Sequence, residues 1–426
     1  MKVSWMPAMV FALFGAMFIS VSPSAVAAPV EITMWDVPES QVYSDWWRKH
    51  AQAFNASHPD IHVTLEVFET EAYRSKIASA LSAGTTPEIF YLPAGPQGFQ
   101  AFRDRQARSL AGLLDATRFT DAAVRACSVE GTLVCMPLYV APNLMYYNKM
   151  LFAASGIDPS RWADPSQPTW EEFAAACDAI KAKGKVPIAL GNGDGWPGTM
   201  YMWSYQNRYG GVQELAAAAG GKGGVSFATA PGFKRAARSV AALGKSRYLP
   251  LGYNGITGGQ KYALFTAGNA AIIYQGPWLL ARIATDAAPD FKFGVFKFPS
   301  FKDGDPASQK DVIGGFDALF VNSRTNKTAA IAVFLNSFAD PNTALSFMKD
   351  TQNVSVIKSV LATGMSPGVI NDIAQITAAA PHISPWWDNY LPNAVADDAT
   401  RTIQGLFDGS IGPDAFLAGM DKAAGR

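Results

Sequence analysis

The sequence predicts an α/β protein of two lobes joined by extended crossings, and three observations lead to this fold class. Strands and helices alternate along most of the chain, which is typical of a largely parallel sheet covered by helices. The chain has 426 residues, enough for two or three domain-sized cores. Residues 131–150 stay extended on both sides of Pro137 and Pro142, although proline cannot donate to a sheet ladder. A segment that stays extended while it leaves one sheet suits a crossing between lobes. We therefore place a hinge here and the candidate site in the cleft beside it.

The first 27 residues are typical of an export signal and not of the fold. Lys2 supplies a positive start, residues 6–21 form an apolar run, and residues 25–27 are small, so we expect cleavage after Ala27. The whole chain carries 35 Lys and Arg against 35 Asp and Glu, without a basic run. This balance argues against nucleic acid as the main partner. After the signal, no stretch approaches the 18 apolar residues of a membrane span.

Three cysteines in an exported chain suggest one disulfide and one free thiol. Cys127 and Cys135 flank a predicted turn at Glu130 and Gly131, and facing positions of a hairpin come within disulfide reach. We therefore expect a Cys127–Cys135 bridge. Cys177 lies on the apolar stripe of a predicted helix, so we expect a buried thiol there.

The first half of the chain alternates between strands at residues 30–35, 61–68 and 89–92 and helices at residues 43–54 and 73–81. Ligands of parallel sheets bind beyond the carboxyl ends of the strands. The residues that follow the first and third strands are therefore candidates for the site, and they include Asp36, Glu39, Ala94 and Gly95.

The second half begins beyond the crossing and has the same alternation. We expect helices at residues 170–183, 200–209, 329–338, 394–407 and 413–424, and extended segments at residues 186–190, 270–274, 291–298 and 312–321. Thr169 and Glu172 form a capping box at the start of the first of these helices. The pair Gly314 and Gly315 in mid-strand indicates a second crossing. These elements divide the chain into residues 28–141 with 315–350 as the N-terminal lobe, and residues 142–314 with 351–426 as the C-terminal lobe.

Six short motifs in register carry a family resemblance over nearly the whole mature chain. They are residues 58–63 (HPDIHV), 83–89 (AGTTPEI), 131–137 (GTLVCMP), 147–149 (YNK), 168–173 (PTWEEF) and 276–278 (GPW). In this order they resemble the extracellular solute-binding proteins of bacterial ABC importers, in the family 1 group that includes maltose-binding protein. The resemblance implies a class II periplasmic binding protein fold, in which a ligand is held in the cleft between two α/β lobes.

The resemblance and the strand ends together place thirteen residues at the ligand. The position of the family's C-terminal cleft tryptophan falls on a small residue near Ala396, and the neighbouring Trp386 and Trp387, earlier in the chain, are candidates to replace it; we include Trp386. The expected ligand-binding residues are Trp35, Asp36, Glu39, Ala94, Gly95, Tyr139, Trp196, Trp203, Trp278, Gly315, Phe316, Asp317 and Trp386.

The expected function is capture of a sugar, oligosaccharide or polyol in the periplasm and its delivery to a membrane permease. Aromatic rings suit the apolar faces of pyranoses, while carboxylates accept hydrogen bonds from hydroxyls. We expect a monomer without a cofactor, a metal or catalytic activity. Two alternatives remain. A secreted glycoside hydrolase would need two carboxyl groups flanking one bond. A glycerophosphodiester or peptide ligand remains possible on the same fold; an anionic ligand would require Arg or Lys in the cleft loops, and the loops named above carry none.

Overall fold

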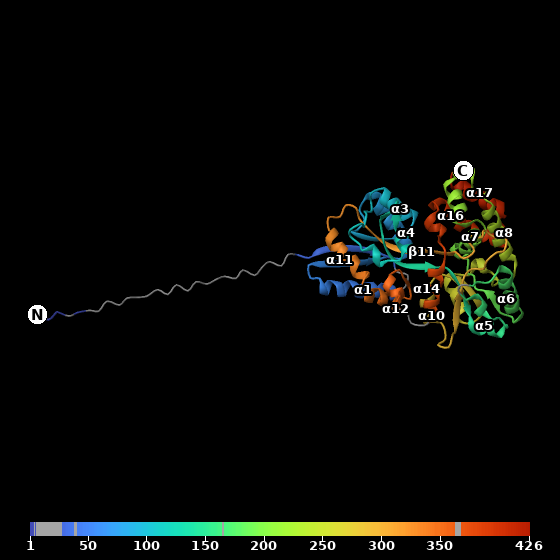
Figure 1. Ribbon diagram of the computed structural model, residues 1–426, viewed down its shortest axis with the longest axis horizontal. Helices are drawn as coiled ribbons and strands as arrows, with labels where there is room; N and C mark the ends of the chain where they lie inside the picture. The colour runs from blue at the N-terminus through green and yellow to red at the C-terminus, as the bar shows by residue number, and fades with distance from the viewer. Residues whose placement is uncertain (4, 6–27, 38–40, 164–165, 363–367) are drawn as a thin grey trace.

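The computed structural model describes the chain except for residues 4, 6–27, 38–40, 164–165 and 363–367 (Figure 1). The predicted cleavage site after Ala27 and the candidate residue Glu39 therefore lie outside the described residues. In the remaining chain, the helices and strands fall into two halves with the strand β11 between them (Figure 1).

The larger sheet has the strand order β12-β6-β11-β3-β1-β2, with β13 also paired to β11. Its strands are β1 (Val30–Asp36), β2 (Ile61–Val67), β3 (Ile89–Pro93), β6 (Met136–Pro142), β11 (Val312–Val321), β12 (Val354–Ser355) and β13 (Ile383–Pro385). The strand β1 is parallel to β2 and β3, whereas β11 is antiparallel to β3 and β6. The carboxyl ends of parallel strands lie at the same edge of a sheet. Asp36 at the end of β1 and Pro93 at the end of β3 therefore lie on the same side.

Helices cover this sheet. They are α1 (Gln41–Ser57), α2 (Thr70–Ala83), α3 (Pro96–Arg103), α4 (Asp121–Ala126), α11 (Thr328–Phe338), α12 (Pro341–Thr351) and α13 (Lys358–Ala362), with a 3₁₀ turn η1 (Ala116–Arg118). Helix α1 buries one face because Tyr43, Trp47 and Phe54 recur at helical spacing. The ring of Trp47 stacks on Phe338 of α11 at 5.4 Å between centroids. The predicted helix at residues 329–338 thus packs in the first half, as expected.

The smaller sheet has the order β10-β7-β9-β8. Its strands are β7 (Leu144–Asn148), β8 (Val186–Ile188), β9 (Ala270–Gln275) and β10 (Phe293–Phe296). Both faces are buried, since Met145 and Tyr147 of β7 join one hydrophobic core and Leu144 and Tyr146 join another. This explains why the strand is apolar or aromatic from Leu144 to Tyr147, as in sheets covered on both sides.

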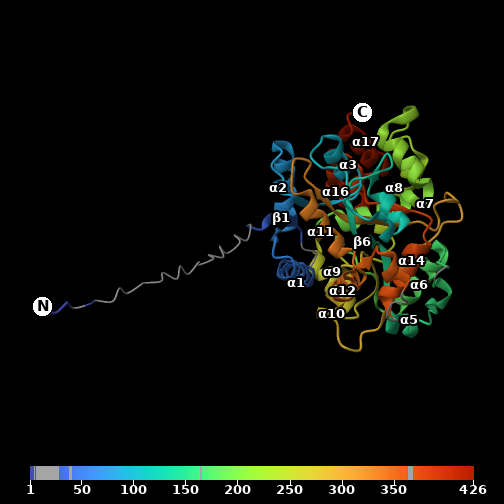
Figure 2. The same cartoon turned by 60° about the vertical axis from the view of Figure 1, so that its left-hand side comes forward.

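Helices surround the smaller sheet. They are α5 (Lys149–Ala154), α6 (Trp170–Ala182), α7 (Trp196–Gly220), α8 (Pro231–Lys245), α9 (Gly258–Thr266), α10 (Leu279–Asp286), α14 (Val369–Ala379), α15 (Trp387–Tyr390), α16 (Asn393–Asp408) and α17 (Pro413–Ala423), with 3₁₀ turns η2 (Pro159–Trp162), η3 (Lys222–Gly224) and η4 (Tyr253–Gly255). Both views show α16 and α17 beside α7 and α8 (Figure 1, Figure 2). The capping box of Thr169 and Glu172 starts α6, as predicted. None of the helices in the described part of the chain is long and apolar enough to cross a membrane.

Three segments run side by side where the chain passes between the sheets. Strand β6 ends at Pro142 and β7 begins at Leu144, so only Asn143 separates the larger sheet from the smaller one. The Asn143 N–H donates to the carbonyl of Ile313 at 2.7 Å. Gly314 of β11 faces Pro142 on one side and Pro385 of β13 on the other. A Cβ at Gly314 would lie 2.8 Å from the carbonyl oxygen of Ala141, so glycine permits this close approach.

The strand pairing differs from the predicted division at residue 350. Val354 and Ser355 of β12 pair with Val140 and Tyr139 of β6, so the chain is still part of the larger sheet there. It leaves by way of β13, which is paired to β11. Residues 354–355 and 383–385 thus lie in the larger sheet, while α14 between them also packs against β10 of the smaller one. Two-residue strands such as β12 are too short to show a periodic pattern.

The cysteine prediction is confirmed. Strands β4 (Ser128–Val129) and β5 (Thr132–Leu133) form a hairpin whose turn residues Glu130 and Gly131 both have positive φ. The flanking Cys127 and Cys135 form a disulfide with their Cα atoms 5.1 Å apart. Cys177 is a buried free thiol, and burial raises its pKa.

Candidate functional site

The carboxyl edges of both sheets meet at the crossings. In the larger sheet, β1 and β3 end there and Asp317 lies opposite Pro93. In the smaller sheet, β8 and β9 are parallel, and Leu144 at the start of β7 lies opposite Gln275 at the end of β9. The segments that follow β8 and β9 therefore emerge beside Asn143. This is the edge where ligands of α/β sheets bind.

A polar row crosses this end of the larger sheet. The neighbouring strands β1, β3, β11 and β6 contribute Asp36, Tyr91, Asp317 and Tyr139, respectively. The hydroxyls of Tyr91 and Tyr139 both donate to Asp317. Asp36 accepts from the N–H of Val37 at 2.8 Å and from the hydroxyl of Tyr43 at 3.1 Å. The row thus alternates carboxyl and phenol groups.

Burial dominates the electrostatics of the row. Asp36 is 1% exposed and Asp317 is 3% exposed. The pKa of Asp36 is raised to about 7, chiefly by burial and to a smaller extent by the nearby Asp317, while the hydrogen bonds from Val37 and Tyr43 oppose the change. Burial also raises the pKa of Asp317, while the hydrogen bonds from Tyr139 and Tyr91 oppose the change. Because both carboxyls already have phenol partners and little exposed surface, the row fixes the end of the sheet. Its half-exposed member is Tyr91.

The other candidates of the larger lobe line the same edge. Trp35 is half-buried, with the ammonium of Lys76 4.1 Å from its ring centroid. The N–H of Ala94 donates to the carbonyl of Phe316 at 2.8 Å, which joins the loop after β3 to β11. Gly95 precedes α3 with φ 148°, in the region open to glycine. Phe316 itself is buried in the core.

Three tryptophans form a string at the crossings. Trp196 begins α7, Trp278 follows β9 and Trp386 follows β13. The ring centroids of Trp196 and Trp278 are 6.5 Å apart and those of Trp278 and Trp386 are 6.0 Å apart, both in edge-to-face contact. All three rings are partly buried. The structure therefore brings together three of the predicted aromatic candidates from segments far apart in sequence.

The string is attached to the crossing segments. The indole N–H of Trp386 donates to the side-chain oxygen of Asn143 at 3.3 Å. Its ring lies over Gly315, where a Cβ would be only 2.7 Å from the ring. The ring of Trp278 covers Gly276 in the same way, and a Cβ at Gly276 would lie 2.1 Å from that ring. Since Gly315 and Asp317 are two residues apart on β11, they face the same side of the sheet, and the string continues from the polar row.

Trp203 does not join this string. It is 5% exposed and packs in the core of the smaller half, on a helix that buries residues all round. Helices α8 and α16 pack against α7 there, and a role of Trp203 in ligand binding stays a prediction.

Sequence reasoning missed Lys261 and Tyr262 of α9. The Lys261 ammonium lies 4.5 Å from the ring centroid of Trp196 and 4.9 Å from that of Tyr262. The Tyr262 hydroxyl accepts from the Gln275 amide at 3.0 Å and from Trp278. Burial lowers the pKa of Lys261 to about 7, against the charge of Asp194. A signal was present: Lys261 lies four residues before the buried Phe265, on the inner stripe of the helix.

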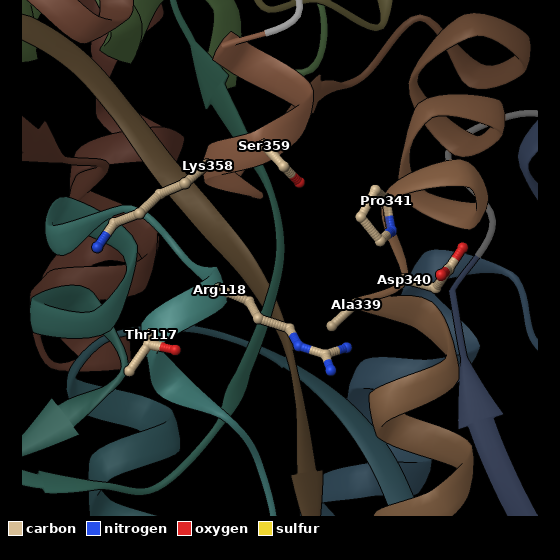
Figure 3. A pocket seen from close by; sticks show the side chains of 7 residues that line it. All are labelled: Thr117, Arg118, Ala339, Asp340, Pro341, Lys358 and Ser359. Carbon is tan, nitrogen blue, oxygen red and sulfur yellow. The ribbon is translucent and has the colours of Figure 1, made fainter.

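A separate hollow of about 410 Å³ lies on the surface of the larger lobe (Figure 3). Its lining residues are Thr117, Arg118, Ala339, Asp340, Pro341, Lys358 and Ser359. Arg118 pairs with Asp115 at 3.3 Å and Lys358 with Asp121 at 2.9 Å, so both cations are compensated. No predicted site residue lines this hollow.

The chain is similar to known binding proteins over most of its length. It is 25% identical over 407 residues to the sn-glycerol-3-phosphate-binding periplasmic protein UgpB of Yersinia pestis bv. Antiqua, covering 91% of this chain and 83% of that protein. The UgpB of Shigella flexneri is 24% identical over 328 residues, with 72% of this chain and 70% of the relative covered.

Solved structures share the two-lobe fold. A chitin oligosaccharide binding protein matches with a TM-score of 0.81 and 22% identity over 93% of this chain and 98% of its own. The maltose-bound MalE3 of T. maritima matches with a TM-score of 0.73 and 17% identity, over 93% and 99% of the two chains. The family model of the bacterial extracellular solute-binding proteins matches residues 39–343. The chain belongs to the bacterial extracellular solute-binding protein family.

Proposed function

We propose that this solute-binding protein captures a sugar, oligosaccharide or polyol between its lobes and delivers it to the permease of an ABC transporter. The observation that carries the proposal is the string of Trp196, Trp278 and Trp386 at the edge where both sheets end. Flat rings match the apolar faces of sugar rings, and the adjoining polar groups fix the hydroxyls.

Closure of the lobes is the proposed mechanism. Trp386 is hydrogen-bonded to Asn143 of one crossing segment and lies over Gly315 of another. Since Trp386 itself belongs to the third crossing segment, its ring connects all three. A solute that contacts this ring and Trp278 would bind the closed arrangement better than the open one. It can shift the equilibrium only by that difference in affinity.

The family and the names of the similar proteins support this proposal. The solved structures cited above are of proteins named for chitin oligosaccharide and maltose, and the curated relatives are called periplasmic. We further propose export to the periplasm with cleavage after Ala27, a monomeric state and no catalytic role. The UgpB relatives favour one second candidate, sn-glycerol 3-phosphate or a glycerophosphodiester.

The test is binding by the Trp278→Ala variant. A thermal-shift screen of sugars, polyols and their phosphates first finds a ligand; one at 100 times its dissociation constant should add about 2.7 kcal/mol of stability. Loss of a stacking ring should then weaken that ligand roughly ten- to hundredfold in a calorimetric titration, as hot-spot truncations of about 2 kcal/mol do.

Trp170→Ala is the matched control, because Trp170 is also partly buried but stacks on Phe301 away from the string. It should lower stability and leave affinity unchanged. If Trp278→Ala bound normally while losing about 3–5 kcal/mol of stability, as core truncations do, Trp278 would be a core residue and the proposal would fail.

A further inference from the structure

Lys261 is a buried cation beside the tryptophan string. Its side chain is 1% exposed and comes from the first turns of α9, which the capping box of Thr257 and Gln260 fixes. A Cβ on Gly191 would lie 2.9 Å from the Cβ of Lys261, so glycine lets the segment after β8 pack directly on the lysine stem. The base of the side chain is therefore closely packed at its Cβ, and the ammonium at its far end lies against the ring of Trp196.

The ammonium of Lys261 has no hydrogen-bond partner among the described residues. The rings of Trp196 and Tyr262 lie within 5 Å of it, and the charge of Asp194 also favours the ammonium. A buried charge is costly unless hydrogen bonds satisfy it. The cation–π contacts and the charge of Asp194 provide no such hydrogen bond to the ammonium.

Another buried cation of this lobe, Arg208, shows the contrast. Arg208 is also 1% exposed, but it donates to the carbonyls of Phe298, Pro299 and Ser308 and to the side chain of Asn207 at 2.9–3.1 Å. A cation with a structural role is thus fully bonded in this protein. Lys261, beside the proposed binding site, is not.

We propose that the solute carries an oxyanion, as a phosphate or carboxylate group on a sugar or polyol, and that the Lys261 ammonium receives it. This inference rests on the proposed function and deepens it, since Trp278 would stack on the sugar or polyol part of the same molecule. Lysine binds such groups as a point charge. In the structure the ammonium is covered by Trp196 and Tyr262, so binding includes its release from the face of Trp196.

Matched pairs of ligands test the proposal by calorimetric titration of the full protein, refolded to remove bound solute. The pairs are sn-glycerol 3-phosphate with glycerol and galacturonate with galactose, and inorganic phosphate is the third probe. In at least one pair the anion should bind ten times or more tightly than its neutral counterpart. The phosphate and carboxylate arms show which oxyanion is used.

Two variants identify the residue. Lys261→Met keeps the length and apolar stem and should remove the preference for the anion, whereas Lys261→Arg should keep most of it. Lys185→Met is the control, because Lys185 donates to the carbonyl of Gly268 at 3.1 Å next to the amino end of β8, away from the site. Wild-type protein should also take up protons on binding the anion at pH 8, measured in buffers of different ionisation enthalpy, and Lys261→Met should not.

The outcomes separate this inference from the proposed function. Tight binding of neutral sugars that Lys261→Met leaves unchanged would overturn the inference and leave the proposed function standing. Absence of binding by every sugar, polyol and acidic derivative would overturn both. If Lys261→Met does not fold, the wild-type pairs and Lys261→Arg decide, and equal affinity for anion and neutral partner rejects the inference.

Discussion

Replacing Asp36 by asparagine should stabilise the protein above neutral pH. The Asp36 carboxyl is 1% exposed, and burial raises its pKa to about 7 from 3.8. Between these two values the folded protein holds a proton that the unfolded chain has released. Stability therefore falls as pH rises from about 4 to 7, and the loss is complete above pH 7. An asparagine stays neutral at every pH and keeps the oxygen that accepts from the N–H of Val37, while its amide NH2 takes the place of the oxygen that accepts from the Tyr43 hydroxyl.

The size of the effect follows from the pKa. A change from 3.8 to about 7 corresponds to about 4 kcal/mol, an upper limit for the gain above pH 7. The wild type and Asp36→Asn should have nearly equal stability at pH 4 and diverge steadily to pH 8. The stability of Asp36→Asn should still fall somewhat as pH rises, because burial raises the pKa of Asp317 as well.

Urea denaturation followed by tryptophan fluorescence at pH 4, 5, 6, 7 and 8 measures this divergence. Asp290→Asn, at an exposed position, is the control and should leave the pH profile parallel to that of the wild type. If Asp36→Asn were less stable than the wild type at pH 8, the ionised carboxylate of Asp36 would be stabilising the folded protein. The argument from burial would then be refuted.

Three further changes have defined outcomes. Serine at both Cys127 and Cys135 should lower the free energy of unfolding by about 2–3 kcal/mol, and non-reducing peptide mapping of the wild type should find only Cys177 as a free thiol. Gly315→Val should push Trp386 from its place and weaken solute binding about tenfold or more with a folded apo protein, which titration and circular dichroism would check. A tight ligand should reduce the radius of gyration in small-angle scattering at constant secondary structure, and an unchanged radius would argue against closure.

The parts of the fold that sequence predicted are those with long or strongly constrained patterns. Strand β11 was expected at residues 312–321 and has those bounds, because a stretch in which Asp317 alone is neither apolar nor glycine leaves few alternatives. The crossing near Pro142 was expected because proline ends a ladder. Strand β12 was missed, since two residues carry no period and their pairing with β6 depends on contacts across more than 200 positions.

The candidate site was predictable where a residue's place follows from the end of a strand. Trp278 after β9 and Asp36 at the end of β1 lie at the expected edge for this reason. The burial of Trp203 was not predictable, because helical spacing alone does not tell which of several faces is covered. Lys261 was missed because the search for cations was confined to loops, while this lysine reaches the site from the inner stripe of α9.

The two lobes bring opposite charges to the same site, and this orients the proposed solute. The larger lobe contributes Asp36 and Asp317, which burial and mutual repulsion keep from ionising together near neutral pH. The smaller lobe contributes the unpaired ammonium of Lys261. An oxyanion near the two carboxyls would add a negative charge to the one that they share in a region of low dielectric, whereas neutral hydroxyls there would add none. The anionic end should therefore face the smaller lobe and the hydroxyl end the larger one. Such a solute would contact both lobes only when they are closed, so its own charge distribution would make closure selective for it.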